Sequence, residues 1–201
     1  FIDQHIHGAS GFDAMDGTLD ALSGIAEALP KEGTTAFLAT TMTQSPANIN
    51  TALETVKNYK NMNKAEGAEI LGTHLEGPFI SSSHIGAQPL EYVAEPLVET
   101  FKKYQEVSGN TIKLVSLAPE VPGAEELIKY LKSQNIVASV GHSAAGFNDV
   151  EKAVAAGISN VTHTYNAQKA YHHRDIGTVG AALLLDELNC EIICDTIHVS
   201  V

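Results

Sequence analysis

The stretch Glu69-Ile70-Leu71-Gly72-Thr73-His74-Leu75-Glu76-Gly77-Pro78-Phe79 decides the fold class, because an apolar strand ends within it on one acidic residue. Most of residues 69–76 are apolar, small or β-branched, which predicts a parallel strand buried on both faces. Glu76 closes that strand, and a Gly-Pro pair follows at once. Burying a carboxylate there costs free energy unless a cation or hydrogen-bond donors satisfy it. The stretch therefore predicts a buried strand with a functional acid at its carboxyl end.

Further segments share the apolar or β-branched character of this strand. They are Phe1–His7, Thr34–Thr41, Ile112–Pro119, Ile136–His142, Asn160–Asn166 and Glu191–His198. Between the strands, apolar residues recur at helical spacing in stripes over residues 19–29, 49–59, 90–104, 127–131 and 147–154. Strands that alternate with helices in this way predict a parallel α/β fold.

Three of the predicted helices carry boundary signals. Ser45-Pro46 suits an N-cap followed by the first helical turn, so the second helix should begin there. Pro96 predicts a start or a break within the third stripe. Gly157 is suited to end the last helix, because glycine readily adopts the backbone conformation that follows a helix.

Polar residues at the strand ends distinguish two α/β architectures. The residues are His5, His7, Glu76, His142, His163 and His198, and they close five different predicted strands. A doubly wound sheet concentrates its ligands at one switch point. A barrel instead collects them from many strands onto one face. The sequence therefore predicts a (β/α)8 TIM-type barrel, of which this chain supplies seven of the eight strands.

Composition excludes several classes of protein. The 201-residue chain has a formal net charge of −12, which argues against binding to nucleic acid or to an anionic membrane. No apolar run approaches the roughly 18 residues that span a bilayer, and no basic-then-apolar signal peptide opens the chain. Cys190 and Cys194 fit no zinc or redox spacing, so we expect two reduced core thiols in a cytoplasmic protein.

The strand-end histidines, together with Glu76, predict a metal site. In a strand, residues i and i+2 point the same way, so both imidazoles of His5-Ile6-His7 should face one side. His142 and His163 each close a later predicted strand. Imidazole nitrogens combined with a carboxylate oxygen suit a divalent ion such as zinc, iron, manganese or cobalt.

Several groups near these ends admit more than one interpretation. His74 shares the strand face of Glu76, either as support for a metal ligand or as a core histidine. Glu76 could instead be a structural acid paired with a basic side chain, although few of the 12 lysines and arginines lie near predicted strand ends. Arg174 suits a phosphate or oxyanion clamp, or a solvated loop. His198 faces the same side as the other ligands if Ile197 packs outward.

Several motifs identify a family resemblance. They are Phe1-Ile2-Asp3-x-His5-x-His7-Gly8, His74-Leu75-Glu76-Gly77-Pro78-Phe79, Gly86-Ala87-Gln88, Gly141-His142-Ser143, Thr162-His163-x-Tyr165-Asn166-Ala167, His172-His173-Arg174 and Asp195-x-x-His198-Val199. In order and spacing, along essentially the whole chain, they resemble the N-acetylglucosamine-6-phosphate deacetylases of the amidohydrolase superfamily. The Leu-Glu-Gly-Pro-Phe and Tyr-Asn-Ala segments are the more specific ones, whereas many relatives share H-x-H.

The resemblance has implications for the fold and the extent of the chain. It implies a (β/α)8 barrel with a small β-sandwich built from both chain ends, and neither sandwich segment is present. The first residues, Phe1-Ile2-Asp3, have the character of a strand interior without an initiator Met. We therefore expect residues 1–201 to be a single, incomplete barrel domain from a longer protein. The family's catalytic aspartate would follow Val201, so the segment alone should be inactive, and the full-length protein should be a homodimer.

The resemblance also implies roles for individual residues. Glu76, His142 and His163 would hold the principal divalent ion, and His5 and His7 a second one bridged by Glu76. Substrate contacts would come from Ala87, Gln88, Asn166, Ala167, Arg174, Asp195, Thr196, Ile197 and His198. Of these, Arg174 would contact the 6-phosphate. His198 would be the catalytic residue within the chain and would contact the sugar or the reacting amide.

The implied reaction is metal-assisted hydrolysis of N-acetylglucosamine 6-phosphate, a small phosphosugar, to acetate and glucosamine 6-phosphate. Four positions depart from the family pattern: Gln168, Asp175-Ile176 and Thr196 replace Met, Glu-Pro and Gly. Two alternatives stay open. One is an amidohydrolase acting on another N-acyl or cyclic amide substrate, and the other is a non-catalytic barrel that only binds metal.

Overall fold

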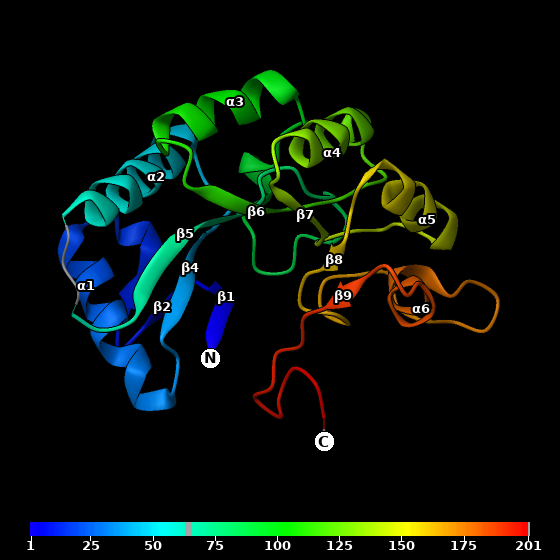
Figure 1. Cartoon of the computed structure of the whole chain (residues 1–201). Helices are drawn as coiled ribbons and strands as arrows, with labels where there is room; N and C mark the ends of the chain where they lie inside the picture. Colours follow the sequence, from blue (N-terminus) through cyan, green and yellow to red (C-terminus); the bar gives the residue numbers. More distant parts are fainter. Residues whose placement is uncertain (63–65, 201) are drawn as a thin grey trace. The chain divides into compact units, whose positions relative to one another are not determined.

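The computed structural model describes residues 1–62 and 66–200 of the chain (Figure 1). The chain divides into two compact units. The first unit combines Phe1–Glu76 with Glu99–Leu114, and the second combines Gly77–Val98 with Val115–Val201. No helix among the described residues is long and apolar enough to cross a membrane.

The first unit is built on parallel strands. β4 (Ala36–Thr41) pairs in parallel with β1 (Ile2–Ile6) and with β5 (Glu69–Glu76). β6 (Ile112–Leu117) begins in this unit, where the amide of Thr73 donates to the carbonyl of Thr111 at 2.9 Å. Its remaining elements are β2 (Gly8–Ala9), β3 (Phe12–Asp13), η1 (Ala14–Asp16), α1 (Leu19–Ala28), η2 (Leu29–Glu32), α2 (Pro46–Asn61) and most of α3 (Val98–Val107).

The second unit continues the same alternation. β8 (Asn160–Val161) pairs in parallel with β7 (Val137–Val140) and with β9 (Asn189–Cys190). The end of β6 joins it, because the amide of Gly141 donates to the carbonyl of Leu117 at 3.0 Å. The unit also contains η3 (Leu90–Tyr92), α4 (Ala124–Ser133), α5 (Phe147–Ala156) and α6 (Gly177–Leu184).

The order of the strands confirms the predicted fold class. The seven-stranded sheet runs β1-β4-β5-β6-β7-β8-β9, so neighbouring strands follow one another along the chain. A doubly wound sheet would reverse its order at a switch point, whereas a TIM-type barrel adds each strand beside the previous one. The chain therefore has the parallel α/β fold of a (β/α)8 barrel, with seven strands of that sheet among residues 1–62 and 66–200.

The helical boundaries follow from local sequence. Ser45 Oγ accepts a hydrogen bond from the amide of Asn48 at 3.3 Å, and Pro46 is the first residue of α2 as predicted. Gly157 ends α5, also as predicted. The third stripe was only partly right: α3 begins two residues after Pro96, so Leu90 lies outside it and is 54% exposed.

Apolar helix faces form the core that supports the strands. In the first unit, Leu22 and Ile25 of α1 pack in one buried cluster with Phe37 of β4, Val56 of α2 and Ile70 of β5. In the second unit the predicted stripes are also buried, including Leu127 and Leu131 of α4 and Val150 of α5. These side chains stabilise the fold by removing apolar surface from water, each by roughly 1.5–3 kcal/mol.

The structure corrects two predicted strands near the carboxyl end and adds one helix there. The predicted strand Asn160–Asn166 stops at Val161, and the predicted strand Glu191–His198 is replaced by β9, which ends at Cys190. Left-handed backbone angles at His163 (φ 33°) and Thr196 (φ 64°) are incompatible with an extended strand. Helix α6 was not predicted, because residues 177–182 are all buried and give no alternation of apolar and polar faces.

The two cysteines are free, as predicted, but they are not core residues. Cys190 and Cys194 are both exposed. The prediction that both are core residues was therefore wrong. β9 ends at Cys190, and Cys194 lies in the irregular segment beyond it, where its Sγ makes a weak contact to the carbonyl of Ile192 at 3.6 Å.

Candidate functional site

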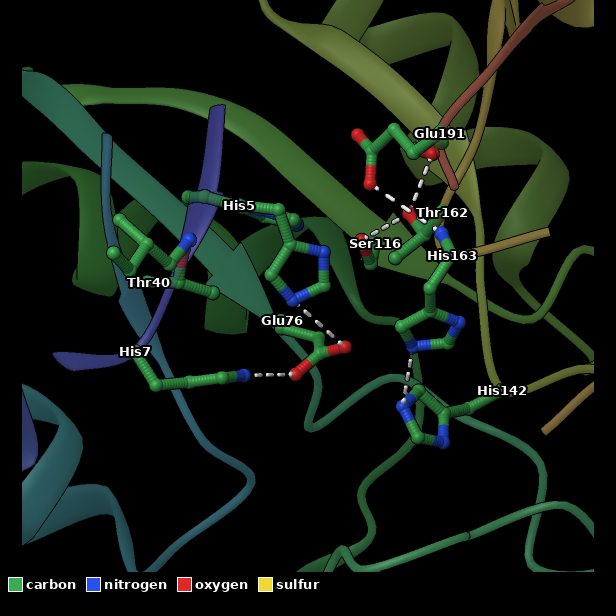
Figure 2. Close-up of polar contacts among 12 residues, drawn as sticks. His5, His7, Thr40, Glu76, Ser116, His142, Thr162, His163 and Glu191 are labelled. Carbon is green, nitrogen blue, oxygen red and sulfur yellow. Dashed lines mark hydrogen bonds and ion pairs between the residues drawn. The ribbon is translucent and has the colours of Figure 1, made fainter. Parts of the chain in front are cut away.

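In the first unit, two histidines converge on one buried carboxylate (Figure 2). Glu76 is the last residue of β5 and is 2% exposed. His5 Nε2 lies 3.4 Å from one carboxylate oxygen, and His7 Nε2 lies 3.1 Å from the other. The three ligand atoms lie within 4.8 Å of one another, which fits the two nitrogen donors and one oxygen donor of a divalent ion.

Irregular pairing at the end of β1 sets the direction of these histidines. The register between β1 and β4 shifts between Asp3 and Ile6. Side chains then replace backbone acceptors: the amide of Ile6 donates to Thr40 Oγ1 at 2.9 Å, and the amide of His5 donates to Asp3 Oδ1 at 3.0 Å. The H-x-H segment is thereby fixed against β4, with both rings facing Glu76 as the alternation predicted.

His74 supports the His5 ring from within the unit. It is fully buried, and its ring meets that of His5 edge to face at a centroid distance of 4.6 Å. Burial first, and then the neighbouring His5, hold the pKa of His74 well below its usual value, so the ring is neutral. Its Nδ1 lies 3.1 Å from the carbonyl of Gln4, to which it donates a hydrogen bond.

In the second unit, two further histidines meet through their Nε2 atoms. His142 lies two residues beyond β7 and His163 two residues beyond β8. Their Nε2 atoms are 3.2 Å apart, and the rings are nearly perpendicular at 85° (Figure 2). The Nδ1 of His142 lies 3.0 Å from the carbonyl of His84 and donates to it, which leaves a lone pair on Nε2. This tautomer suits a metal ligand.

A hydroxyl network underlies His163. Thr162 Oγ1 lies 2.6 Å from both Ser116 Oγ and Ser139 Oγ, and all three residues are completely buried. The carbonyl of Thr162 accepts from Gln168 Nε2 at 2.5 Å. Hydrogen bonds therefore hold both the side chain and the backbone of Thr162, the residue before His163.

The structure brings together some of the predicted substrate residues. A Cβ atom built on Gly86 would lie 3.3 Å from Ala167 Cβ and 3.3 Å from His142 Cε1. The segment carrying Ala87 and Gln88 therefore runs against Ala167 and against the ring of His142. Gln88 is buried and Asn166 is partly buried, whereas Ala87 is exposed.

Other predicted substrate residues lie at the surface. Arg174 is exposed, and it is the only arginine of the sequence. Asp195, Thr196, Ile197 and His198 form an exposed turn outside any strand. Asp195 accepts from the amides of His198 and Ile197 and lies 2.5 Å from His198 Nδ1. These bonds, above all the one from the His198 amide, lower the pKa of Asp195 from 3.8 to about 2.

The strand-end positions, the convergence of His5 and His7 on Glu76, and the pairing of His142 with His163 are the pattern of a metal-dependent hydrolase. A family model described as "Amidohydrolase family" matches residues 1–185. The chain belongs to the amidohydrolase family. Members of this family generally depend on metal, in agreement with the ligand groups above.

Individual amidohydrolases are closely similar to this chain. It is 47% identical to N-acetylglucosamine-6-phosphate deacetylase of Bacillus subtilis over 98% of this chain and 50% of that protein. It is 37% identical to N-acetylgalactosamine-6-phosphate deacetylase of Escherichia coli O157:H7, over 99% of this chain and 52% of that protein. The chain thus spans about half the length of the curated relatives it matches.

A solved amidohydrolase structure agrees with the fold. It is N-acetyl-D-glucosamine-6-phosphate deacetylase from Mycobacterium smegmatis in complex with N-acetyl-D-glucosamine-6-phosphate, with a TM-score of 0.92 at 27% identity. The match covers 100% of this chain and 51% of that one. The family resemblance predicted from sequence is confirmed.

The residues that support the histidine ligands of the second unit were not predicted from sequence. Glu120, Ser116 and Ser139 were not singled out, although each contacts the second-unit site or its supporting loops. A signal for Glu120 was present, because it follows the predicted strand Ile112–Pro119 directly, as Glu76 ends its own strand. Serines inside apolar strands gave no comparable signal, since small residues are ordinary there.

Proposed function

We propose that this chain carries the metal centre and much of the substrate site of an N-acetylglucosamine-6-phosphate deacetylase. The observation that carries the proposal is the convergence of His5 and His7 on opposite oxygens of Glu76, in a chain 47% identical to the Bacillus subtilis deacetylase. The reaction would release acetate and glucosamine 6-phosphate. The domain would be a single barrel over residues 1–201, completed in a longer protein by an eighth strand and a β-sandwich.

The donor sets support the choice of metal ligands. Glu76, His142 and His163 would hold the principal ion, and His5 and His7 would hold a second ion bridged by Glu76. All five supply imidazole nitrogen or carboxylate oxygen, which suits zinc, iron, manganese or cobalt. Bound there, a divalent ion supplies Lewis acidity toward the amide carbonyl and makes water acidic enough to react near neutral pH.

Residues of this chain would bind and orient the phosphosugar. Arg174 would clamp the 6-phosphate, because a guanidinium binds phosphate in a bidentate manner. It is the only arginine of the sequence, so no other side chain offers this geometry. Ala87, Gln88, Asn166 and Ala167 would contact the sugar.

The turn from Asp195 through Thr196 and Ile197 to His198 would face the reacting amide. Asp195, held ionised by its low pKa, accepts from His198 Nδ1 and so fixes the direction of the ring. The Nε2 of His198 would then be directed toward the sugar or the amide carbonyl, as the catalytic residue within the chain. An aspartate beyond Val201 would move the proton of the attacking water.

A second candidate substrate is N-acetylgalactosamine 6-phosphate. It is favoured by the 37% identity to the Escherichia coli enzyme named for that sugar. The two sugars differ only in the configuration of one hydroxyl, at C4. The departures at Gln168, Asp175-Ile176 and Thr196 lie in segments near the proposed substrate contacts, so they bear on this choice.

We also propose the compartment, the oligomeric state and the partners of the protein. We expect a cytoplasmic homodimer, with no nucleic-acid or membrane partner. The two free, exposed cysteines support a reducing compartment, because exposed thiols oxidise elsewhere. The net charge of −12 supports the exclusion of nucleic acid.

Acetate release and metal content test the proposal. We would assay the 201-residue chain and the longer natural protein that contains it with both 6-phosphosugars and with unphosphorylated N-acetylglucosamine. We expect one or two divalent ions per protein and turnover only by the longer protein. Turnover by the 201-residue chain alone would contradict the need for an eighth strand. Metal without acetate release from any of these sugars would favour the non-catalytic barrel.

Arg174→Ala sharpens the substrate assignment. We expect its kcat/KM for the phosphosugar to fall by about 10- to 200-fold, because a charge-assisted bond contributes roughly 1.5–3 kcal/mol. Activity toward the unphosphorylated sugar should be unchanged. Lys129→Ala is the control, since Lys129 pairs with Glu125 on the exposed face of α4. Equal losses of kcat/KM on both sugars would show that Arg174 does not bind the phosphate.

A further inference from the structure

Glu120 binds the segment that directly follows His142. It lies just beyond β6 and is partly buried. One carboxylate oxygen accepts from Ser143 Oγ at 2.7 Å, and the other accepts from the amide of Ala144 at 2.5 Å. Hydrogen bonds to an ionised acceptor are about twice as strong as those between neutral groups. Glu120 therefore holds the hydroxyl of Ser143 and the backbone amide of Ala144, the two residues that follow His142.

Ser143 passes this restraint to the turn that carries His163. Its amide donates to the carbonyl of Ala167 at 3.1 Å, and its carbonyl accepts from the amide of Lys169 at 3.0 Å. These two bonds pair Ser143 with Gln168 in a short parallel bridge. The loop after β7 and the turn after β8 are thereby joined at Ser143, the residue whose hydroxyl Glu120 holds.

Both histidines need such a restraint. His142 has φ 50° and His163 has φ 33°, in the left-handed region that residues other than glycine rarely adopt. Such conformations persist only where the surrounding structure holds them. The Nε2 atoms of the two rings, 3.2 Å apart, could not stay in register if either loop relaxed.

We propose that Glu120 is a positioning residue for the metal centre. It acts through Ser143 and Ala144 to hold the Nε2 atoms of His142 and His163 where both can bind one divalent ion. The inference rests on the proposed function, because it presupposes a metal on these histidines. Glu120 itself neither touches the substrate nor binds the ion.

Cobalt(II) binding, followed by its visible absorption, tests this role in the intact natural protein. We expect Glu120→Ala to weaken cobalt affinity about 10- to 100-fold, the usual loss when a partner of a metal ligand is removed. Glu120→Gln should lose less, since its amide oxygen can still accept from Ala144. Glu125→Ala is the control, because Glu125 pairs with Lys129 on the surface of the same unit.

The outcomes separate positioning from general stability and from the metal assignment. The phase of cobalt binding that Glu120→Ala weakens should be the one that His142→Ala abolishes. A lower midpoint of unfolding in the metal-free protein, with unchanged cobalt affinity of the folded protein, would overturn the inference. If Glu120→Ala does not fold, wild-type cobalt affinity and spectrum in Glu120→Gln would overturn it as well. If His142→Ala binds cobalt as wild type does, the metal assignment itself is wrong, and the inference falls with it.

Discussion

The two units hold their histidines by different means. In the first, His5 lies within β1, His7 follows it directly and Glu76 ends β5, so all three ligands lie in a strand or next to one. In the second, His142 and His163 lie two residues beyond their strands, on left-handed turns held by hydrogen bonds from polar side chains. Thr40 and Asp3 hold the backbone of the first pair of histidines against a neighbouring strand. The turns of the second pair depend instead on Glu120, Gln168 and the hydroxyl network of Thr162. Substitutions in the two units should therefore differ in their effects on metal content and on stability.

The largest effect is expected where a ligand is removed. Glu76→Gln keeps the size of the side chain but removes the charge that His5 and His7 face. We expect metal content and acetate release to fall more than about 100-fold, beyond the range for a residue that only supports a ligand. Metal analysis and the deacetylase assay measure this.

Glu69→Gln is the matched control for that substitution, because Glu69 lies at the opposite end of β5 and is exposed. It should leave both quantities unchanged. A metal content in Glu76→Gln equal to that of the wild type would show that Glu76 is a structural acid.

An intermediate effect distinguishes the two kinds of support. Thr162→Val removes the hydroxyl shared by Ser116 and Ser139, so each of these buried serines loses its hydrogen bond to Thr162. We expect the free energy of unfolding in urea to fall by about 1–3 kcal/mol. Thr73→Val, in β5 of the first unit, is the comparison.

Thr73 Oγ1 is buried with no hydrogen-bond partner among the described residues, so the valine should be neutral or slightly stabilising. Equal losses of stability in Thr162→Val and Thr73→Val would contradict the difference between a turn supported by hydroxyls and a regular strand.

The smallest effect lies in the exposed turn of the second unit. Because the folded pKa of Asp195 is about 2, below its ordinary 3.8, the bonds from His198 and Ile197 stabilise the fold above pH 3.8 and are lost as the pH falls through 2. Solvent exposure keeps the stability change small. NMR titration of the carboxyl carbon should give a midpoint near 2, and His198→Ala should move it toward 3.8. A midpoint of 3.8 in the unsubstituted protein would show that the turn is not formed in solution.

Regular elements explain how much of the fold could be predicted from sequence. β5 has the predicted bounds, Glu69–Glu76, because its residue types are those of a buried strand. His5 and His7 both face Glu76, as expected for residues i and i+2 of an extended chain. His142 and His163 were identified by residue type, but the strand predicted around His163 was wrong. Nothing in Thr162-His163-Thr164 signals the positive φ of His163, which depends on contacts with residues distant in sequence such as Ser116, Ser139 and Glu191.

The site was predicted less completely than the fold for the same reason. Glu120 lies 23 residues from Ser143 along the chain, and Ser116 lies 46 residues from Thr162. Local periodicity carries no information about such pairs. Similarly, residues 191–198 have the composition of a strand, yet the bonds within Asp195-Thr196-Ile197-His198 favour a turn.

The three hydroxyls at Thr162 also have a consequence for proton order. Thr162 has a single hydroxyl proton, so it can donate to Ser116 and accept from Ser139, or the reverse, with all heavy atoms in the same places. The interior beside His163 can therefore reverse its local dipoles by rotating hydrogens alone. Such a reversal needs no rearrangement of the packed core, because only hydroxyl hydrogens move.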